Sequence, residues 1–131
     1  MGRAFAVIQL DTNYLILASQ AGSPEELDLQ RWLTGGEVLS TSSIAWMEFV
    51  SGPVHPDVVE SIRLTLEDRV VAFSQEDAEL AAHLFNLTGR RRGLRYDCMI
   101  AAAAIMKNAS LATRNAADFQ TFLAHGLRLA T

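Results

Sequence analysis

Residues Phe5–Leu10 read FAVIQL, and the next three residues are Asp11, Thr12 and Asn13. A short apolar run that stops at an acidic residue is typical of a strand buried on both faces, as in a parallel sheet. We therefore predict a first strand here, with Asp11 at its carboxyl end. Ligands of α/β proteins bind beyond the carboxyl ends of parallel strands, so Asp11 is the first candidate for a functional residue.

Outward from this strand, short apolar runs alternate with segments of helical spacing. Further strands are predicted at residues 37–40, 69–73, 110–113 and 127–130. Helices are predicted at residues 13–20, 24–34, 43–49, 56–68, 75–88, 97–107 and 115–125. Ser23, Ser42 or Ser43, and Ser74 are the expected helix caps. This alternation predicts an α/β fold with a five-stranded parallel sheet covered on both faces.

Length and composition predict one domain, 1–131, in the cytoplasm. A chain of 131 residues, half of them hydrophobic, can bury one core and is too short for two. The longest apolar run, Cys98–Met106, is far shorter than the roughly 20 residues of a membrane-spanning helix. Cys98 is the single cysteine, which excludes an internal disulfide and suits a reducing compartment.

Three further acidic residues stand near predicted strand ends. Glu48 lies about one turn into the helix after the second strand, and Asp118 follows the fourth strand. Asp97 opens the apolar helix that leads into that strand. If these carboxylates meet Asp11 in one pocket, they repel one another unless a cation intervenes. Carboxylate oxygens without His or Cys favour Mg²⁺, with Mn²⁺ as a substitute, and predict phosphodiester hydrolysis.

Four separated motifs resemble, in order, those of the PIN-domain family, and of its VapC-type ribonuclease toxins in particular. They are Asp11-Thr12-Asn13, Ser43 with Glu48, Tyr96-Asp97 opening IAAAA, and LATRNAADF at residues 111–119. Together they span nearly the whole chain. The resemblance implies a three-layer α/β/α sandwich with strand order 3-2-1-4-5, a Mg²⁺ pocket and endoribonuclease activity on RNA.

The resemblance also implies roles for individual residues. Asp11 and Asp97 would be the core metal ligands, and Glu48 would complete the ligand set or orient a water molecule. Asp118 would compensate for Asn115, which stands where many PIN proteins carry an Asp and which leaves open whether one or two metals bind. Thr113 would support the pocket through its hydroxyl, and Asn13, Ser43 and Asn115 are further supporting candidates.

The implied partners are RNA, a cognate antitoxin protein and, in a homodimer, a second copy of the chain. The chain as a whole carries a net charge of −4, so contact with nucleic acid must be local. One basic cluster is available, formed by Arg90, Arg91, Arg92 and Arg95. It is either a solvated loop or a grip on the RNA backbone or on an acidic antitoxin segment.

Each acidic residue also has a plain structural explanation. Asp97 could be an ordinary helix N-cap, Asp11 could end a strand, Glu48 could be a solvated helix residue, and Asp118 could favour a helix N-terminus. Two rival functions remain open. A PIN fold could serve as a binding module with weak catalysis, or the chain could be a receiver-type phosphoacceptor domain. The receiver reading requires a lysine near the final strand. It is disfavoured, because Lys107 is the single lysine and stands before the fourth strand.

Overall fold

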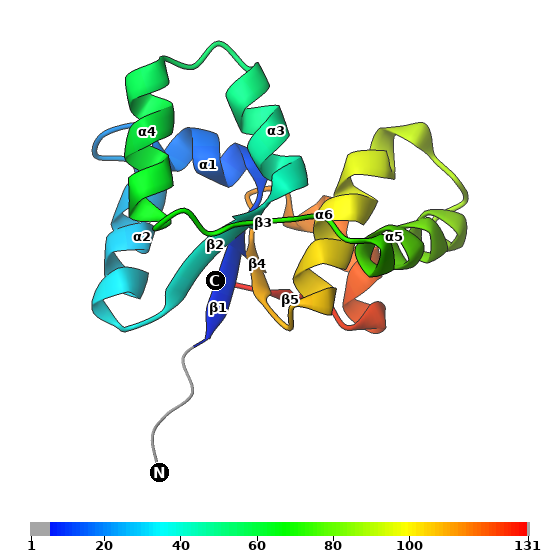
Figure 1. Ribbon diagram of the computed structural model, residues 1–131. Coiled ribbons are helices and arrows are strands. Elements are labelled where there is room, and N and C mark those ends of the chain that lie inside the picture. The colour runs from blue at the N-terminus through cyan, green and yellow to red at the C-terminus, as the bar shows by residue number, and fades with distance from the viewer. Residues whose placement is uncertain (1–5, 131) are drawn as a thin grey trace.

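A five-stranded parallel sheet forms the centre of the molecule in the computed structural model, which describes residues 6–130 (Figure 1). The strand order is β3-β2-β1-β4-β5, so the α/β class and the order implied by the resemblance are confirmed. The strands are β1 (Val7–Leu10), β2 (Val38–Ser42), β3 (Val70–Val71), β4 (Ser110–Ala112) and β5 (Arg128–Leu129). All four strand pairs are parallel, which brings the carboxyl ends of the strands to one edge. Phe5, predicted to begin the first strand, lies outside the described residues.

Helices pack on both sides of the sheet (Figure 1). The α-helices are α1 (Thr12–Ala18), α2 (Pro24–Thr34), α3 (Ser43–Ser51), α4 (Pro56–Thr65), α5 (Gln75–Leu87), α6 (Arg95–Met106) and α7 (Ala116–Phe119). Two 3₁₀ helices are η1 (Arg92–Leu94) and η2 (Gln120–His125). Helices α1 and α2 connect β1 to β2, and α3 and α4 connect β2 to β3. Helices α5 and α6 then return the chain from β3 to β4 across the other face of the sheet.

Serine side chains begin three of the helices. Ser23 caps α2 by accepting from the Glu26 amide, and Ser74 caps α5 in a reciprocal capping box with Asp77. For α3 the cap is Ser42, whose hydroxyl accepts from the Ala45 amide, so Ser42 and not Ser43 is the cap. Strand β2 therefore runs two residues beyond the predicted end at Ser40.

Three predicted boundaries were wrong for local reasons. The helix predicted to reach Asp68 ends at Thr65, because Glu67 and Asp68 have positive φ angles of 51° and 60° and turn the chain towards β3. The strand predicted at 69–73 is only the two residues of β3. The helix predicted at 115–125 is divided into the short α7 and the 3₁₀ helix η2.

Helix α6 begins at Arg95, two residues earlier than predicted. The basic cluster is therefore not one loop, since η1 and the first residue of α6 form much of it. Asp97 is the third residue of α6, and Leu94 occupies the N-cap without a side-chain bond. The capping explanation for Asp97 is thus wrong. The four alanines of α6, residues 101–104, are buried and allow the helix to pack closely on its neighbours.

Within residues 6–130, no helix is long and apolar enough to span a membrane. The core is formed by the apolar faces of the sheet and of the helices on both sides, with Leu10, Leu39 and Leu111 fully buried in neighbouring strands. Cys98 is buried as a free thiol, as expected of a small core residue. This packing holds the strand ends, and the acidic residues that follow them, in fixed relative positions.

Candidate active site

Asp11 lies at the carboxyl end of the central strand and is the N-cap of α1. Its side chain is buried, with only 4% of the residue exposed. One carboxylate oxygen, Oδ1, accepts from the Thr12 amide at 2.7 Å, and the other, Oδ2, accepts from the Thr113 hydroxyl at 2.8 Å. The Asp11 amide donates to the Ala112 carbonyl at 2.9 Å, so β4 holds both the backbone and the side chain of Asp11.

Burial raises the pKa of Asp11 above the ordinary value for an aspartate, because the charged form loses hydration. The two hydrogen bonds from Thr113 and Thr12 act in the opposite direction, and the charges of Glu48 and Asp118 raise the pKa further. The hydrogen bonds thus stabilise the charged form of Asp11, while the neighbouring negative charges destabilise that form.

Asp97 is half-buried in the first turn of α6 and is influenced by the same group of acids. Burial raises the pKa of Asp97 to about 6, and the charges of Asp11, Asp118 and Glu48 add to the effect. Asp118, an exposed residue of α7, therefore lies close enough to act on both Asp11 and Asp97. The structure gathers four carboxylates from β1, α3, α6 and α7 into one electrostatic neighbourhood.

Thr12 holds Glu48 in place, a contact that the sequence analysis did not predict. Glu48 Oε1 accepts from the Thr12 hydroxyl at 2.7 Å, which links α3 to the start of α1. Glu48 is half-buried, so its plain explanation as a fully solvated helix residue is wrong. Thr12 was inside the Asp-Thr-Asn motif, but only the packing of α1 against α3 shows that its hydroxyl meets Glu48.

Among residues 6–130, Thr113 is the one supporting candidate whose side chain donates a hydrogen bond to any of the four acids. The Thr113 hydroxyl donates to Asp11 as expected and also accepts from the Asn115 amide at 2.9 Å, which shapes the turn after β4. Asn13 and Asn115 have exposed side chains. The Ser43 hydroxyl instead accepts from the Phe73 amide at 3.1 Å, so its bond joins α3 to the segment after β3.

The donor set suits a hard divalent cation. All four acids offer oxygen, and a cation among them would offset both the lost hydration and the mutual repulsion that raise the pKa of Asp97. Across residues 6–130, however, no three His, Cys, Asp or Glu side chains are arranged so that they could already share one ion. The carboxylates are therefore neighbours whose side chains would have to turn towards a bound metal.

The basic cluster lies on exposed surface at the start of the same helix that carries Asp97. Arg90 donates to Asn86 Oδ1 at 2.6 Å, and the guanidinium groups of Arg90 and Arg95 lie 5.4 and 5.5 Å from the centre of the Phe85 ring. Arg91 and Arg92 are exposed. The cluster thus contains two arginines held on an aromatic ring and two on open surface.

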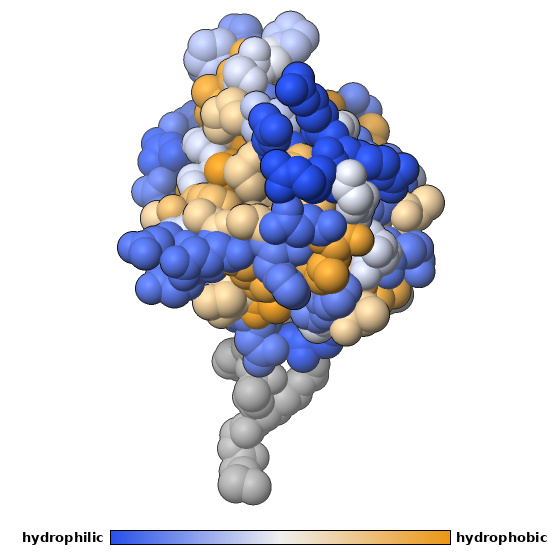
Figure 2. Space-filling view, turned by 90° about the vertical axis from the view of Figure 1, so that its right-hand side faces the viewer, coloured by the Kyte–Doolittle hydropathy of each residue, from blue (hydrophilic) through white to orange (hydrophobic). Residues whose placement is uncertain are grey.

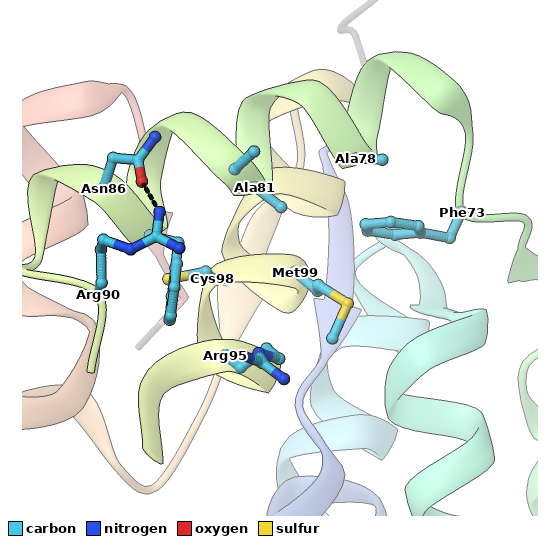
Figure 3. A pocket seen from close by; sticks show the side chains of 10 residues that line it. Phe73, Ala78, Ala81, Asn86, Arg90, Arg95, Cys98 and Met99 are labelled. Atoms are coloured by element: carbon cyan, nitrogen blue, oxygen red, sulfur yellow. Dashed lines mark hydrogen bonds between the residues drawn. The ribbon is translucent and has the colours of Figure 1, made fainter. Parts of the chain in front are cut away.

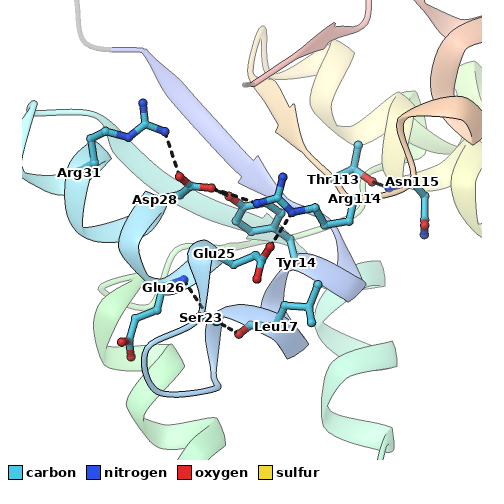
Figure 4. Close-up of polar contacts among 10 residues, drawn as sticks. All are labelled: Tyr14, Leu17, Ser23, Glu25, Glu26, Asp28, Arg31, Thr113, Arg114 and Asn115. Carbon is cyan, nitrogen blue, oxygen red and sulfur yellow. Dashed lines mark hydrogen bonds and ion pairs between the residues drawn. The ribbon is translucent and has the colours of Figure 1, made fainter.

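An ion-pair network beside the site was missed by the sequence reasoning (Figure 4). Arg114 Nε donates to the buried Glu25 carboxylate at 2.6 Å, and Arg114 Nη2 lies 3.3 Å from Asp28 Oδ2. The guanidinium also covers the Tyr14 ring at 5.2 Å. Burial, followed by the hydrogen bond that Tyr14 donates to Asp28, raises the pKa of Tyr14, so its hydroxyl remains a donor.

Arg114 stands between Thr113 and Asn115, so this network anchors the turn that positions Asp11. Substitution Arg114→Ala leaves the Glu25 carboxylate buried without its cation, and we expect a loss of about 1–3 kcal/mol in the free energy of unfolding. Arg31→Ala is the matched control, because Arg31 pairs with Asp28 from an exposed position and should change stability by less than about 0.5 kcal/mol. Urea unfolding measures both, and equal losses would contradict the assignment.

The burial of Asp97 among other carboxylates predicts a pH-dependent stability for the metal-free protein. Because the folded-state pKa of Asp97, about 6, exceeds the ordinary 3.8, neutral Asp97 favours folding below pH 3.8 and this advantage is lost as pH rises through 6. In EDTA, Asp97→Asn should therefore raise the urea midpoint at pH 7 and change it little at pH 4. Glu79→Gln, at an exposed position on α5, serves as the control. A lower midpoint for Asp97→Asn at pH 7 would refute the electrostatic argument.

Comparisons with known proteins agree with the fold. The family model for the PIN domain matches residues 8–121. No curated protein matches the sequence. A toxin–antitoxin complex from Klebsiella pneumoniae has a chain that is 27% identical, with 88% of this chain and 90% of that chain covered and a TM-score of 0.68.

Two further solved structures share the fold at lower identity. VapBC-1 from nontypeable Haemophilus influenzae is 22% identical over 95% of this chain and 96% of that chain, with a TM-score of 0.68. DNA-bound VapBC from Salmonella typhimurium is 23% identical over 97% and 98%, also with a TM-score of 0.68. These two neighbours share the fold of this chain. Because the family model covers well over half of its length, this chain belongs to the PIN domain family.

Proposed function

We propose that this protein is a Mg²⁺-dependent endoribonuclease that acts in the cytoplasm as the toxin of a toxin–antitoxin pair. The observation that carries the proposal is the gathering of Asp11, Glu48 and Asp118 around the half-buried Asp97, whose pKa is raised to about 6 by burial and further by these three charges. Structural carboxylates are normally paired with cations or kept apart. A cluster of acids at the carboxyl edge of a parallel sheet instead fits a divalent-metal site.

The four carboxylates would hold the ion, with Mn²⁺ as a substitute for Mg²⁺. Such an ion supplies a water molecule of lowered pKa and positive charge for the phosphate and leaving oxygen. The protein's own part is orientation. Thr113 and the Thr12 amide hold the two oxygens of Asp11, and the Thr12 hydroxyl holds Glu48 Oε1. The free Oε2 of Glu48 is then available to complete the ligand set or to orient a water molecule.

The basic cluster is the proposed contact with the RNA backbone. Arg90, Arg91, Arg92 and Arg95 are all exposed, and Arg95 lies two residues before Asp97 in α6. Guanidinium groups bind phosphate through paired hydrogen bonds. The positive charge of these arginines would offset locally the repulsion between RNA and a chain whose net charge is −4 and whose candidate site is acidic.

Cleavage of a mixed RNA preparation tests the catalytic proposal. Cleavage should require Mg²⁺ or Mn²⁺ and stop in EDTA, and Asp11→Asn or Asp97→Asn should lower the rate on the order of 100-fold, the equivalent of about 2.7 kcal/mol of transition-state stabilisation. Thr113→Val removes the donor to Asp11 and should cost about 10–100-fold, with Thr113→Ser retaining most of the rate.

Asp57→Asn is the matched control, since Asp57 is an exposed carboxylate on α4 and should leave the rate unchanged. Cleavage that persists in EDTA would exclude the metal-dependent mechanism. Absence of cleavage in every metal would exclude the enzyme and favour the alternative of a PIN-fold binding module, which Asn115 in place of an acid would then explain.

The antitoxin partner is proposed from the solved toxin–antitoxin complexes that share this fold and from a groove of mixed polar and apolar lining on the other side of the sheet from the arginines. The groove lies between α2 and α4, has a volume of about 340 Å³, and includes Leu29, Leu33, Val58 and Ile62 in its lining. A protein segment with apolar side chains would bury this surface.

Leu33 lines this groove and is 43% exposed, so Leu33→Glu places a charge there without disrupting the core. We expect binding of the protein encoded beside the gene to weaken by about tenfold or more while RNA cleavage stays unchanged. Leu87→Glu, at a 51% exposed position on α5, should have no effect on either. Pull-down and calorimetry measure this difference, and equal binding by both variants would place the partner elsewhere.

A homodimer is also proposed, as expected from the resemblance. Met47 and Val50 on α3 are 45% and 44% exposed, and a second copy of the chain could cover them.

A further inference from the structure

A pocket of about 370 Å³ lies between α5 and α6, and none of the four carboxylates lines it (Figure 3). Its floor and walls are apolar or small and include Phe73, Ala78, Ala81, Ala82 and Met99. Alanines on α5 leave space between the two helices. This volume is within the range of small-molecule sites, about 300–1,000 Å³. The lining suits a flat apolar group.

Two cationic side chains stand at this apolar lining. Arg90 and Arg95 come from opposite ends of the segment between α5 and α6, and both guanidinium groups lie over Phe85 at 5.4 and 5.5 Å from its centre. The bond from Arg90 to Asn86 Oδ1, at 2.6 Å, fixes Arg90 further (Figure 3). Because these cations are already held in place, binding an anion there costs less side-chain entropy than at free surface arginines.

The pocket lies next to the candidate active site. Phe73 follows β3 at the carboxyl edge of the sheet, the edge at which Asp11 follows β1. Arg95 is in the same turn of α6 as Asp97, and Cys98 and Met99 continue the lining along that helix. Figure 2 shows this side of the molecule, where strongly hydrophilic surface gathers beside hydrophobic patches.

We propose that this pocket is a subsite for one nucleotide of the substrate, with the base on the apolar lining and its phosphate between Arg90 and Arg95. Apolar surface beside aromatic and guanidinium planes is what unpaired bases stack on, and paired guanidinium groups match a phosphate. An acidic peptide would satisfy the arginines but would leave the apolar slot without a flat group. The inference rests on the proposed nuclease function and deepens it, because it places an unpaired nucleotide beside the scissile bond.

Binding can be measured without metal or catalysis. The full chain, labelled with ¹³C at its methionine methyl groups, is titrated with 5′-AMP in EDTA, and Met99→Leu assigns the Met99 signal. We expect AMP to shift the Met99 methyl and to leave Met106, at the far end of α6, unchanged. Adenosine should bind more weakly, and inorganic phosphate should leave Met99 unshifted.

The double variant Arg90→Gln/Arg95→Gln should weaken AMP binding by about tenfold. Arg31→Gln/Arg69→Gln removes the same charge outside the basic cluster, from side chains that pair with Asp28 and Glu67, and should change binding by less than about twofold. Ala82→Phe fills the pocket without a change in charge and should abolish the Met99 shift. An unaltered Met106 signal in each variant reports an intact fold.

Three outcomes overturn the subsite: no Met99 shift at up to about 10 mM AMP, an equal shift with a poly-glutamate peptide, or a shift that follows protein concentration alone and so reports a second copy. A protein that cleaves RNA but shows no AMP shift loses the subsite and keeps the nuclease. A protein that binds AMP as described but never cleaves RNA keeps the pocket and loses the nuclease.

Discussion

The burial of the Asp11 carboxylate at the end of the central strand is the constraint on which the site depends. A buried carboxylate is unfavourable unless donors or cations compensate for its lost hydration. Here the Thr12 amide and the Thr113 hydroxyl supply two donors, yet burial still raises the pKa of Asp11. Within residues 6–130, no Lys or Arg side chain forms an ion pair with Glu48 or Asp118, so their repulsion of Asp11 is not offset there. The fold thus holds together a group of charges that it does not itself neutralise.

The sheet order explains how such a group forms from distant parts of the chain. Strand β1 lies between β2 and β4, so the elements that follow these two strands both reach Asp11. Thr113 comes from the turn after β4, and Glu48 reaches the site from the helix after β2. On the far side of that turn, Arg114 is bound to Glu25 and Asp28 of α2. The geometry of the carboxylates is therefore supported by hydroxyls close to them and by an ion-pair network next to the turn.

Much of this could be predicted from the sequence, because it depends on local patterns. The strand at FAVIQL, the serine caps of α2 and α5, and the acids after strands are features of short segments. The start of α6 was misplaced because Leu94 begins it without a capping side chain. The pairing of Arg114 with Glu25 joins residues 89 positions apart, and the Thr12–Glu48 bond joins residues 36 apart. Neither pairing has a local sequence signal, since each depends on how α1, α2 and α3 pack.

Acidic and basic side chains form separate clusters in this molecule, and this separation affects how it could bind a polyanion. A chain with a net charge of −4 and an acidic pocket repels a polyanion unless positive charge is placed close to that pocket. Arg95 and Asp97 lie in the same turn of α6, so the helix carries both signs within a few residues. The guanidinium groups of Arg90 and Arg95 lie over the Phe85 ring of α5, and among residues 6–130 neither forms an ion pair with Asp11, Glu48, Asp97 or Asp118. Helix α6 thus begins with positive charge on the side of Phe85 and continues with the negative charge of Asp97, so a polyanion that approached the acidic residues would meet arginines first.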